Sequence, residues 1–233
     1  MSIERGSISS IIGPNGAGKT TLFNLISGAD RSDTGTILFD GTNIEAKYSH
    51  KIARLGLIRT FQGAKVIKRL SVLENVVLAG QNNPGDNLSN FIRPSKRKNY
   101  ELEARAKAEQ LLEMIGLSSL AEGYAGILSG GQRKLLDLAR AMMADPKLLL
   151  LDEPFAGVNP ALVERLLEIL KKLKKERDLT LLLVEHDLET VMSISDKVFV
   201  MAQGTVIASG PPATIYENDA VIEAYLGSRK HSA

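Results

Sequence analysis

The sequence predicts an α/β fold, with a mainly parallel β-sheet core flanked by helices. Two largely apolar runs, residues 147–151 and 180–184, have the length and hydrophobicity of strands that are buried on both faces. Residues 160–176 lie between them and have the spacing of an amphipathic helix. Residues 7–12 lead through a glycine-rich turn into a second amphipathic segment, residues 19–26. Because short buried strands alternate with helices, we expect a parallel sheet.

A helical region and further short strands complete the expected fold. Residues 71–143 are mostly helical in pattern, and one helix within them has an apolar face made of Ala104, Ala108, Leu111, Leu112 and Ile115. The loop at residues 81–99 is rich in Asn, Pro and Gly. Its basic run, Arg93, Lys96, Arg97 and Lys98, is more typical of solvated charge than of an anion site. Further strands are predicted at residues 36–39, 56–61, 197–201 and 205–209.

Composition excludes several classes of protein. The 29 Lys and Arg residues nearly balance 27 Asp and Glu residues, which argues against a dedicated nucleic-acid or membrane-surface binder. The chain has no cysteine, so disulfides, cysteine-bound zinc and thiolate nucleophiles are excluded. No apolar run approaches the roughly 18 residues that a membrane-spanning helix needs. If the protein works at a membrane, we expect another chain to span it.

A phosphate-binding loop follows the first strand. The motif G-x-x-x-x-G-K-[ST] is matched by Gly13, Pro14, Asn15, Gly16, Ala17, Gly18, Lys19 and Thr20. Its glycines allow backbone N–H groups to converge on phosphate oxygens at a helix N-terminus. We expect Lys19 to reach the β- and γ-phosphates of ATP, Thr20 to bind Mg²⁺ and Thr21 to add a phosphate contact. An ordinary glycine turn is the alternative, and the strand-to-helix context argues against it.

Two carboxylates follow the apolar strand at residues 148–151. Asp152 and Glu153 come at its carboxyl end, where open α/β sheets bind ligands. We expect Asp152 to hold the magnesium shell and Glu153 to orient or deprotonate the attacking water as general base. Alone, such a pair is more often a helix N-cap. The phosphate-binding loop favours the catalytic interpretation.

A third motif, Leu128-Ser129-Gly130-Gly131-Gln132, precedes a helical stretch. Ser129 and the two glycines present a helix N-terminus to an anion, although such a cap needs no function by itself. Together, the phosphate-binding loop, this signature and the Leu-Asp-Glu-Pro strand end resemble the ATP-binding-cassette (ABC) family, in which they occur in this order. The resemblance covers essentially the whole chain and implies ATP hydrolysis.

The resemblance also implies a division of the chain. It predicts one domain over residues 1–233, a P-loop NTPase of ABC type. Residues 1–65 and 144–233 would form a RecA-like catalytic core with a truncated antiparallel β portion, and residues 66–143 a helical signature subdomain.

Several site roles are implied by the resemblance alone. Gln62 matches the glutamine that senses Mg²⁺ and the attacking water, and His186 matches the histidine that contacts the γ-phosphate. Residues 156–160 resemble the loop that crosses to a second subunit, although Asn159 stands where many members have Asp. In the family, two subunits sandwich two ATP molecules. The signature residues Ser129, Gly130, Gly131 and Gln132 would therefore close over nucleotide held by the opposing subunit.

Three stretches, residues 59–62, 156–160 and 221–227, resemble the branched-chain amino-acid importer ATPases, whose relatives include amide and urea importers. This resemblance implies a second ATP-binding subunit, identical or related, two transmembrane permease chains and, indirectly, a solute-binding protein, with no nucleic acid. It implies a peripheral location at the cytoplasmic face of the inner membrane. The alternatives are a soluble ABC-type ATPase acting on DNA, ribosomes or iron–sulfur assembly, or a non-hydrolytic nucleotide-dependent regulator.

One departure from the family concerns the start of the chain. Only 12 residues precede Gly13, and residues 1–12 contain no Phe, Tyr or Trp to stack on adenine. We expect ATP binding that is retained but weaker than in relatives with an aromatic base contact.

Overall fold

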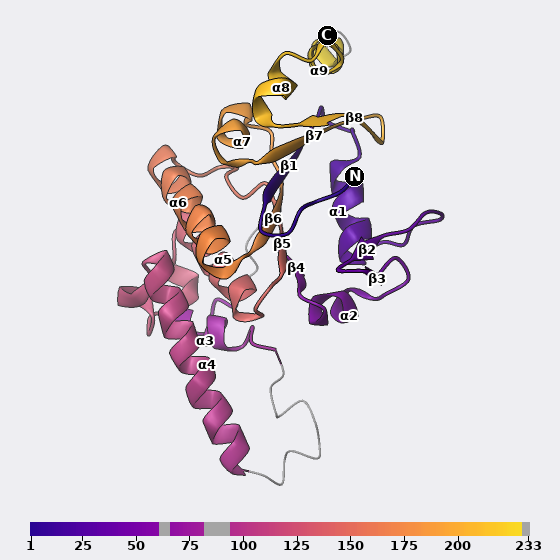
Figure 1. The fold of residues 1–233 in the computed structure, drawn as a ribbon. Coiled ribbons are helices and arrows are strands. Elements are labelled where there is room, and N and C mark those ends of the chain that lie inside the picture. The colour runs from indigo at the N-terminus through magenta and orange to yellow at the C-terminus, as the bar shows by residue number, and fades with distance from the viewer. Residues whose placement is uncertain (61–65, 82–93, 230–233) are drawn as a thin grey trace. The chain divides into compact units, whose positions relative to one another are not determined.

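The computed structural model describes residues 1–60, 66–81 and 94–229 (Figure 1). The chain divides into two compact units. Unit 1 comprises Met1–Gln62, Lys147–Ala156 and Leu170–Ala233, and unit 2 comprises Gly63–Pro146 and Gly157–Ile169.

Unit 1 is built on a six-stranded sheet, which confirms the predicted fold class. Its order is β4-β5-β6-β1-β7-β8. The first five strands are parallel and β8 is antiparallel to β7. In chain order the strands are β1 (Ile8–Ile12), β4 (Leu57–Arg59), β5 (Leu148–Asp152), β6 (Thr180–Val184), β7 (Lys197–Ala202) and β8 (Thr205–Gly210).

Helices cover both faces of this sheet, which explains why the strands β5 and β6 are almost entirely apolar. On one face, Ile11 packs in a cluster with Phe23 of α1 (Lys19–Ser27) and Ile52 of α2 (Ser49–Arg54). On the other, Ile12 packs with residues of α7 (Leu188–Ile194), α8 (Pro212–Tyr216) and α9 (Asp219–Arg229). Figure 1 shows α1 and α7 on opposite sides of β1.

A second, two-stranded antiparallel sheet pairs β2 (Leu38–Phe39) with β3 (Thr42–Asn43). Asp40 and Gly41 form its turn, with φ of 51° and 76°. Positive φ at both central residues is the hairpin geometry that Asp-Gly favours. This small sheet matches the antiparallel portion expected from the sequence.

Unit 2 is helical. It contains α3 (Val72–Val77), α4 (Pro94–Ile115), α5 (Gly130–Met143), the first part of α6 (Pro160–Arg177) and two short 3₁₀ helices, Ser118–Leu120 and Ala125–Ile127. The predicted apolar face of α4 is confirmed, because all five of its residues, Ala104, Ala108, Leu111, Leu112 and Ile115, are buried. Among the residues that the structure describes, no helix has both the length and the apolar character needed to cross a membrane.

Candidate functional site

The phosphate-binding loop joins β1 to α1, as the sequence predicts. Gly13, Gly16 and Gly18 have φ of 152°, 79° and 94°. A Cβ added to Gly13 would lie 2.1 Å from the carbonyl oxygen of Met201, so this position has no room for a side chain. Gly18 caps α1 without a side chain, which leaves the first backbone N–H groups of the helix to an external acceptor. These features fit a phosphate cradle.

Lys19 places its charge inside this loop. Its side chain is buried, and Nζ donates hydrogen bonds to the carbonyl oxygens of Gly13 at 2.8 Å and Pro14 at 3.0 Å. Burial lowers the pKa of Lys19, and the carboxylates of Glu153 and Asp152 oppose that shift. These opposing charges therefore lie within electrostatic reach of the Lys19 ammonium.

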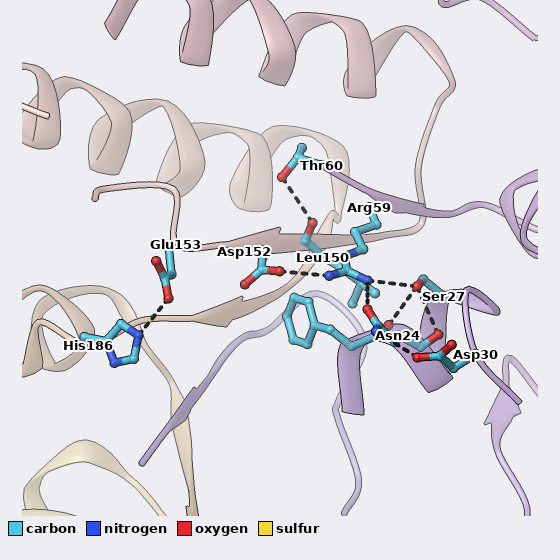
Figure 2. A network of polar contacts seen from close by, with 10 residues as sticks. Asn24, Ser27, Asp30, Arg59, Thr60, Leu150, Asp152, Glu153 and His186 are labelled. Atoms are coloured by element: carbon cyan, nitrogen blue, oxygen red, sulfur yellow. Dashed lines mark hydrogen bonds and ion pairs between the residues drawn. The ribbon is translucent and has the colours of Figure 1, made fainter. Parts of the chain in front are cut away.

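Asp152 and Glu153 leave the end of β5 in different directions (Figure 2). Asp152 is 4% exposed, and its Oδ2 accepts a hydrogen bond from Nη2 of Arg59 at 2.8 Å. Glu153 has φ of 49°, a left-handed conformation that is unusual for a residue with a side chain. Its backbone N–H donates to the carbonyl oxygen of Val184. The chain thus turns sharply off the strand while it stays tied to β6.

Glu153 and His186 form a pair. His186 follows β6, and its Nε2 lies 2.7 Å from Oε1 of Glu153 (Figure 2). The Glu153 side chain is 22% exposed and that of His186 is 46% exposed. The pair is therefore accessible from solvent, at the same edge of the sheet as the Asp152 carboxylate.

Sequence reasoning missed two residues of this site, Arg59 and Glu185. Glu185 is buried, and its carboxylate accepts from the backbone N–H of Phe155 at 2.9 Å and of His186 at 3.2 Å. It thereby holds the loop after Glu153 beside the segment that carries His186. The available signal was a charged residue at the end of an apolar strand, because an ionised group there needs partners.

Unit 2 carries the signature motif at the start of α5. Ser129 Oγ accepts from the backbone N–H of Gln132 at 3.2 Å, and Gln132 Oε1 accepts from the backbone N–H of Ser129 at 2.8 Å. This reciprocal pair is a capping box. A Cβ on Gly131 would lie 2.1 Å from a Leu162 methyl group, whereas one on Gly130 would meet open space. Helix capping and packing thus explain part of the motif, and Gly130 is left without such a reason.

The remaining predicted residues lie as follows. Thr20 and Thr21 are exposed in the first turn of α1. Asn159 Oδ1 accepts from the backbone N–H of Leu162 at 2.9 Å at the start of α6. Gln62 lies outside the described residues.

Comparison with known proteins agrees with this geometry. A family model described as "ABC transporter" matches residues 1–156, and one described as "Branched-chain amino acid ATP-binding cassette transporter" matches residues 205–231. A probable branched-chain amino acid transport ATP-binding protein LivG from Archaeoglobus fulgidus is 44% identical over 98% of this chain and 88% of the relative. The high-affinity branched-chain amino acid transport ATP-binding protein BraF from Pseudomonas aeruginosa is 41% identical over 97% of this chain and 89% of the relative.

The similar solved structures are also ATP-binding cassettes. A nucleotide-free ATP-binding cassette from an ABC transporter superposes with a TM-score of 0.82 at 37% identity, over 97% of this chain and 90% of that one. A dimeric post-hydrolysis cassette bound to ADP and phosphate superposes with a TM-score of 0.73 at 25% identity, over 91% and 88%.

The fold and the phosphate-binding loop define an ATP-binding protein, and the matches specify its kind. The chain belongs to the ABC transporter family. It binds ATP, and its ATP hydrolysis is coupled to transport in association with a membrane. The names of these relatives favour neither a soluble ATPase acting on DNA, ribosomes or iron–sulfur assembly nor a non-hydrolytic regulator.

Proposed function

We propose that this chain powers an importer of branched-chain amino acids or of related amides or urea. The names of the relatives support the solute class, as do the three stretches of sequence that resemble this subfamily. The observation that carries the catalytic part of the proposal is the 2.7 Å pairing of Glu153 with His186 beside the phosphate-binding loop. A carboxylate that is held by a histidine near a phosphate cradle is suited to activate a water molecule as general base.

In this proposal each residue of unit 1 has a defined task. The residues from Gly13 to Thr21 hold the phosphates of ATP, with the Lys19 ammonium supplying positive charge. Glu153 accepts a proton from the attacking water, and His186 holds the Glu153 carboxylate and contacts the γ-phosphate. Because the chemistry of phosphoryl transfer is mainly positioning and charge neutralisation, these groups suffice for the core of a site.

The donor set beside the loop fits a magnesium ion. The Thr20 hydroxyl and the Asp152 carboxylate are the hard oxygen ligands that Mg²⁺ prefers, and nucleotide phosphates commonly complete its shell. Thr20, Asp152 and Gln62 would hold it. When bound, Mg²⁺ neutralises charge on the phosphate oxygens.

The signature belongs to a shared site. We propose that Ser129, Gly130, Gly131 and Gln132 close over ATP held by a second ATP-binding subunit, identical or related. The dimeric cassette among the similar structures supports this arrangement. Unit 1 would then be the catalytic core, and unit 2, which also includes Gly157–Ile169, the helical signature subdomain.

The proposed assembly has further members. Two permease chains would carry the solute across the inner membrane, with this chain at the cytoplasmic face, and a solute-binding protein would deliver it. The transporter relatives support this context. Solute recognition would reside in those partners.

The test is reconstitution of the transporter with its permease chains and binding protein. Glu153→Gln is expected to lower ATPase activity by at least about 100-fold while ATP binding is retained, because it removes the general base. Glu164→Gln, on the exposed side of α6, is the matched control and is expected to behave as wild type. Wild-type activity in Glu153→Gln would contradict the catalytic assignment. Uptake of leucine, acetamide and urea separates the solute classes. If none of these solutes stimulates the ATPase, the importer assignment is contradicted.

A further inference from the structure

Arg59 is a mostly buried cation that joins three elements of unit 1. It is the last residue of β4, and its side chain is only 13% exposed. Its Nη2 donates to Asp152 Oδ2 at 2.8 Å at the end of β5, and its Nη1 donates to Asn24 Oδ1 at 2.7 Å and Ser27 Oγ at 3.3 Å on α1 (Figure 2). One guanidinium therefore links β4, β5 and α1.

The partners on α1 are themselves held in place. Ser27 Oγ donates to the carbonyl oxygen of Phe23 at 2.7 Å, and Asn24 Nδ2 donates to Asp30 at 2.8 Å. The guanidinium carbon also lies 5.6 Å from the centre of the Phe23 ring, within the range of a cation–π contact. Each contact restricts where Arg59 can lie, so the guanidinium is a fixed point for the Asp152 carboxylate.

The planar fork of arginine is essential to this arrangement. Two of its nitrogens point to two different elements at once, whereas a lysine ammonium is a single point charge on a flexible stem. A lysine at this position could satisfy Asp152 or the α1 partners, but not both in the same geometry.

We propose that Arg59 is a positioning residue for the magnesium site. It fixes the Asp152 carboxylate relative to α1, the helix that carries Lys19 and Thr20. This inference rests on the proposed magnesium role of Asp152 and Thr20. Partners that orient a metal-binding carboxylate typically change metal affinity or activity by about 10- to 100-fold when they are removed.

The experiment measures how the affinity for ADP depends on the concentration of Mg²⁺, using the full-length protein and calorimetry. For Arg59→Lys we expect metal-free ADP affinity within about twofold of wild type, and a Mg²⁺ concentration for half-maximal tightening that is about tenfold higher. Arg54→Lys is the matched control, because Arg54 is an exposed arginine at the end of α2. It is expected to reproduce the wild-type titration.

A second variant covers the case in which Arg59→Lys does not fold. Asn24→Ala removes one α1 partner of Arg59 and leaves the Arg59–Asp152 pair intact. It should raise the half-maximal Mg²⁺ concentration by less than Arg59→Lys does, about two- to fivefold.

The outcomes separate the two ideas. If wild-type ADP affinity does not respond to Mg²⁺, the proposed magnesium site itself is wrong. If wild type responds and the variants respond identically, with only their thermal stability lowered, Arg59 has a structural role alone and the inference is overturned.

Discussion

Glu153 and His186 illustrate what single residues reveal in sequence and what they do not. Glu153 is a candidate from its position at a strand end and His186 from the family resemblance, with separate tasks at the water and at the γ-phosphate. The structure joins them at 2.7 Å. That contact depends on β5 and β6 being parallel neighbours in register, with Asp152 opposite Val184, and on the left-handed turn at Glu153. Neither can be read from the spacing of motifs along the chain.

The role of Arg59 could not be predicted from the sequence for the same reason. In the sequence, it counts only as part of a subfamily-like stretch. Its partners are distant along the chain: pairing of β4 with β5 brings Asp152 near, and packing of α1 in the same core cluster as β4 brings Asn24 near. An isolated arginine in a short strand carries no signal of that kind.

At the residue scale, His186→Ala is expected to lower kcat for ATP hydrolysis by about 10²-fold or more, because it removes the group that holds Glu153. Nucleotide affinity should change by less than about threefold, since the phosphate-binding loop is untouched. Steady-state ATPase kinetics and calorimetry measure the two quantities. His50→Gln, an exposed histidine on α2, is the control. If both variants lose kcat equally, the assignment of His186 to the site is contradicted.

Element types followed local pattern in most places, but residues 94–99, which the sequence predicts to be part of a loop, begin helix α4. The buried strands β1, β5 and β6 and the apolar face of α4 appear where the sequence indicates. Short elements did not: α2 has six residues and only Ile52 buried, so it lacks enough turns to display a helical period. Of the strand predicted at residues 56–61, the structure shows Leu57–Arg59, the residues paired with β5, and residue 61 lies outside the described residues.

At the element scale, Ser71→Ala tests the cap of α3. Ser71 Oγ accepts from the backbone N–H of Glu74 at 3.0 Å, and the Glu74 carboxylate accepts from the backbone N–H of Ser71 at 2.7 Å. Loss of such a cap costs about 1 kcal/mol of the free energy of unfolding. Urea denaturation gives the value. Ser119→Ala, at an exposed serine of the same unit, should leave stability within about 0.5 kcal/mol of wild type. A cap variant as stable as this control would contradict the prediction.

Each of the two units is made of segments that alternate along the sequence. Helix α6 contributes residues to both units. The first half of α6 has partners within unit 2: Arg165 Nη2 donates to the carbonyl oxygen of Ile115 at 2.8 Å, and Leu162 packs against Gly131. Such long-range contacts assign a helix to a unit. Composition and periodicity carry no record of them, so a sequence-based boundary falls most naturally in a loop.

Asp196 connects three distant segments of unit 1 and gives its stability a pH dependence. Burial opposes ionisation of Asp196, but hydrogen bonds from the Ile8 N–H and from Lys174, together with the charge of Lys174, outweigh it and lower the pKa below its usual 3.8. The stabilisation by the carboxylate is therefore present above pH 3.8 and is lost as the pH falls through the lower, folded-state pKa.

Asp196→Asn should accordingly cost about 1 kcal/mol of unfolding free energy at pH 7, a value reduced by solvent screening because the side chain is 45% exposed. The difference from wild type should shrink as the pH is lowered below 3.8. Denaturation at pH 7, 5 and 3 measures it. A difference that stays constant over this range would mean that the charge of Asp196 does not contribute.

The position of β1 in the sheet also determines when the protein can fold during synthesis. β1 lies between β6 and β7, which begin at Thr180 and Lys197. At usual translation speeds, roughly 10 to 30 s pass between the synthesis of β1 and that of β6. Throughout that interval both edges of β1, a strand that is fully buried in the native sheet, lack their native neighbours on the ribosome. The nascent chain is therefore an expected client of ribosome-associated chaperones, and its native sheet forms only after β6 and β7 have been synthesised.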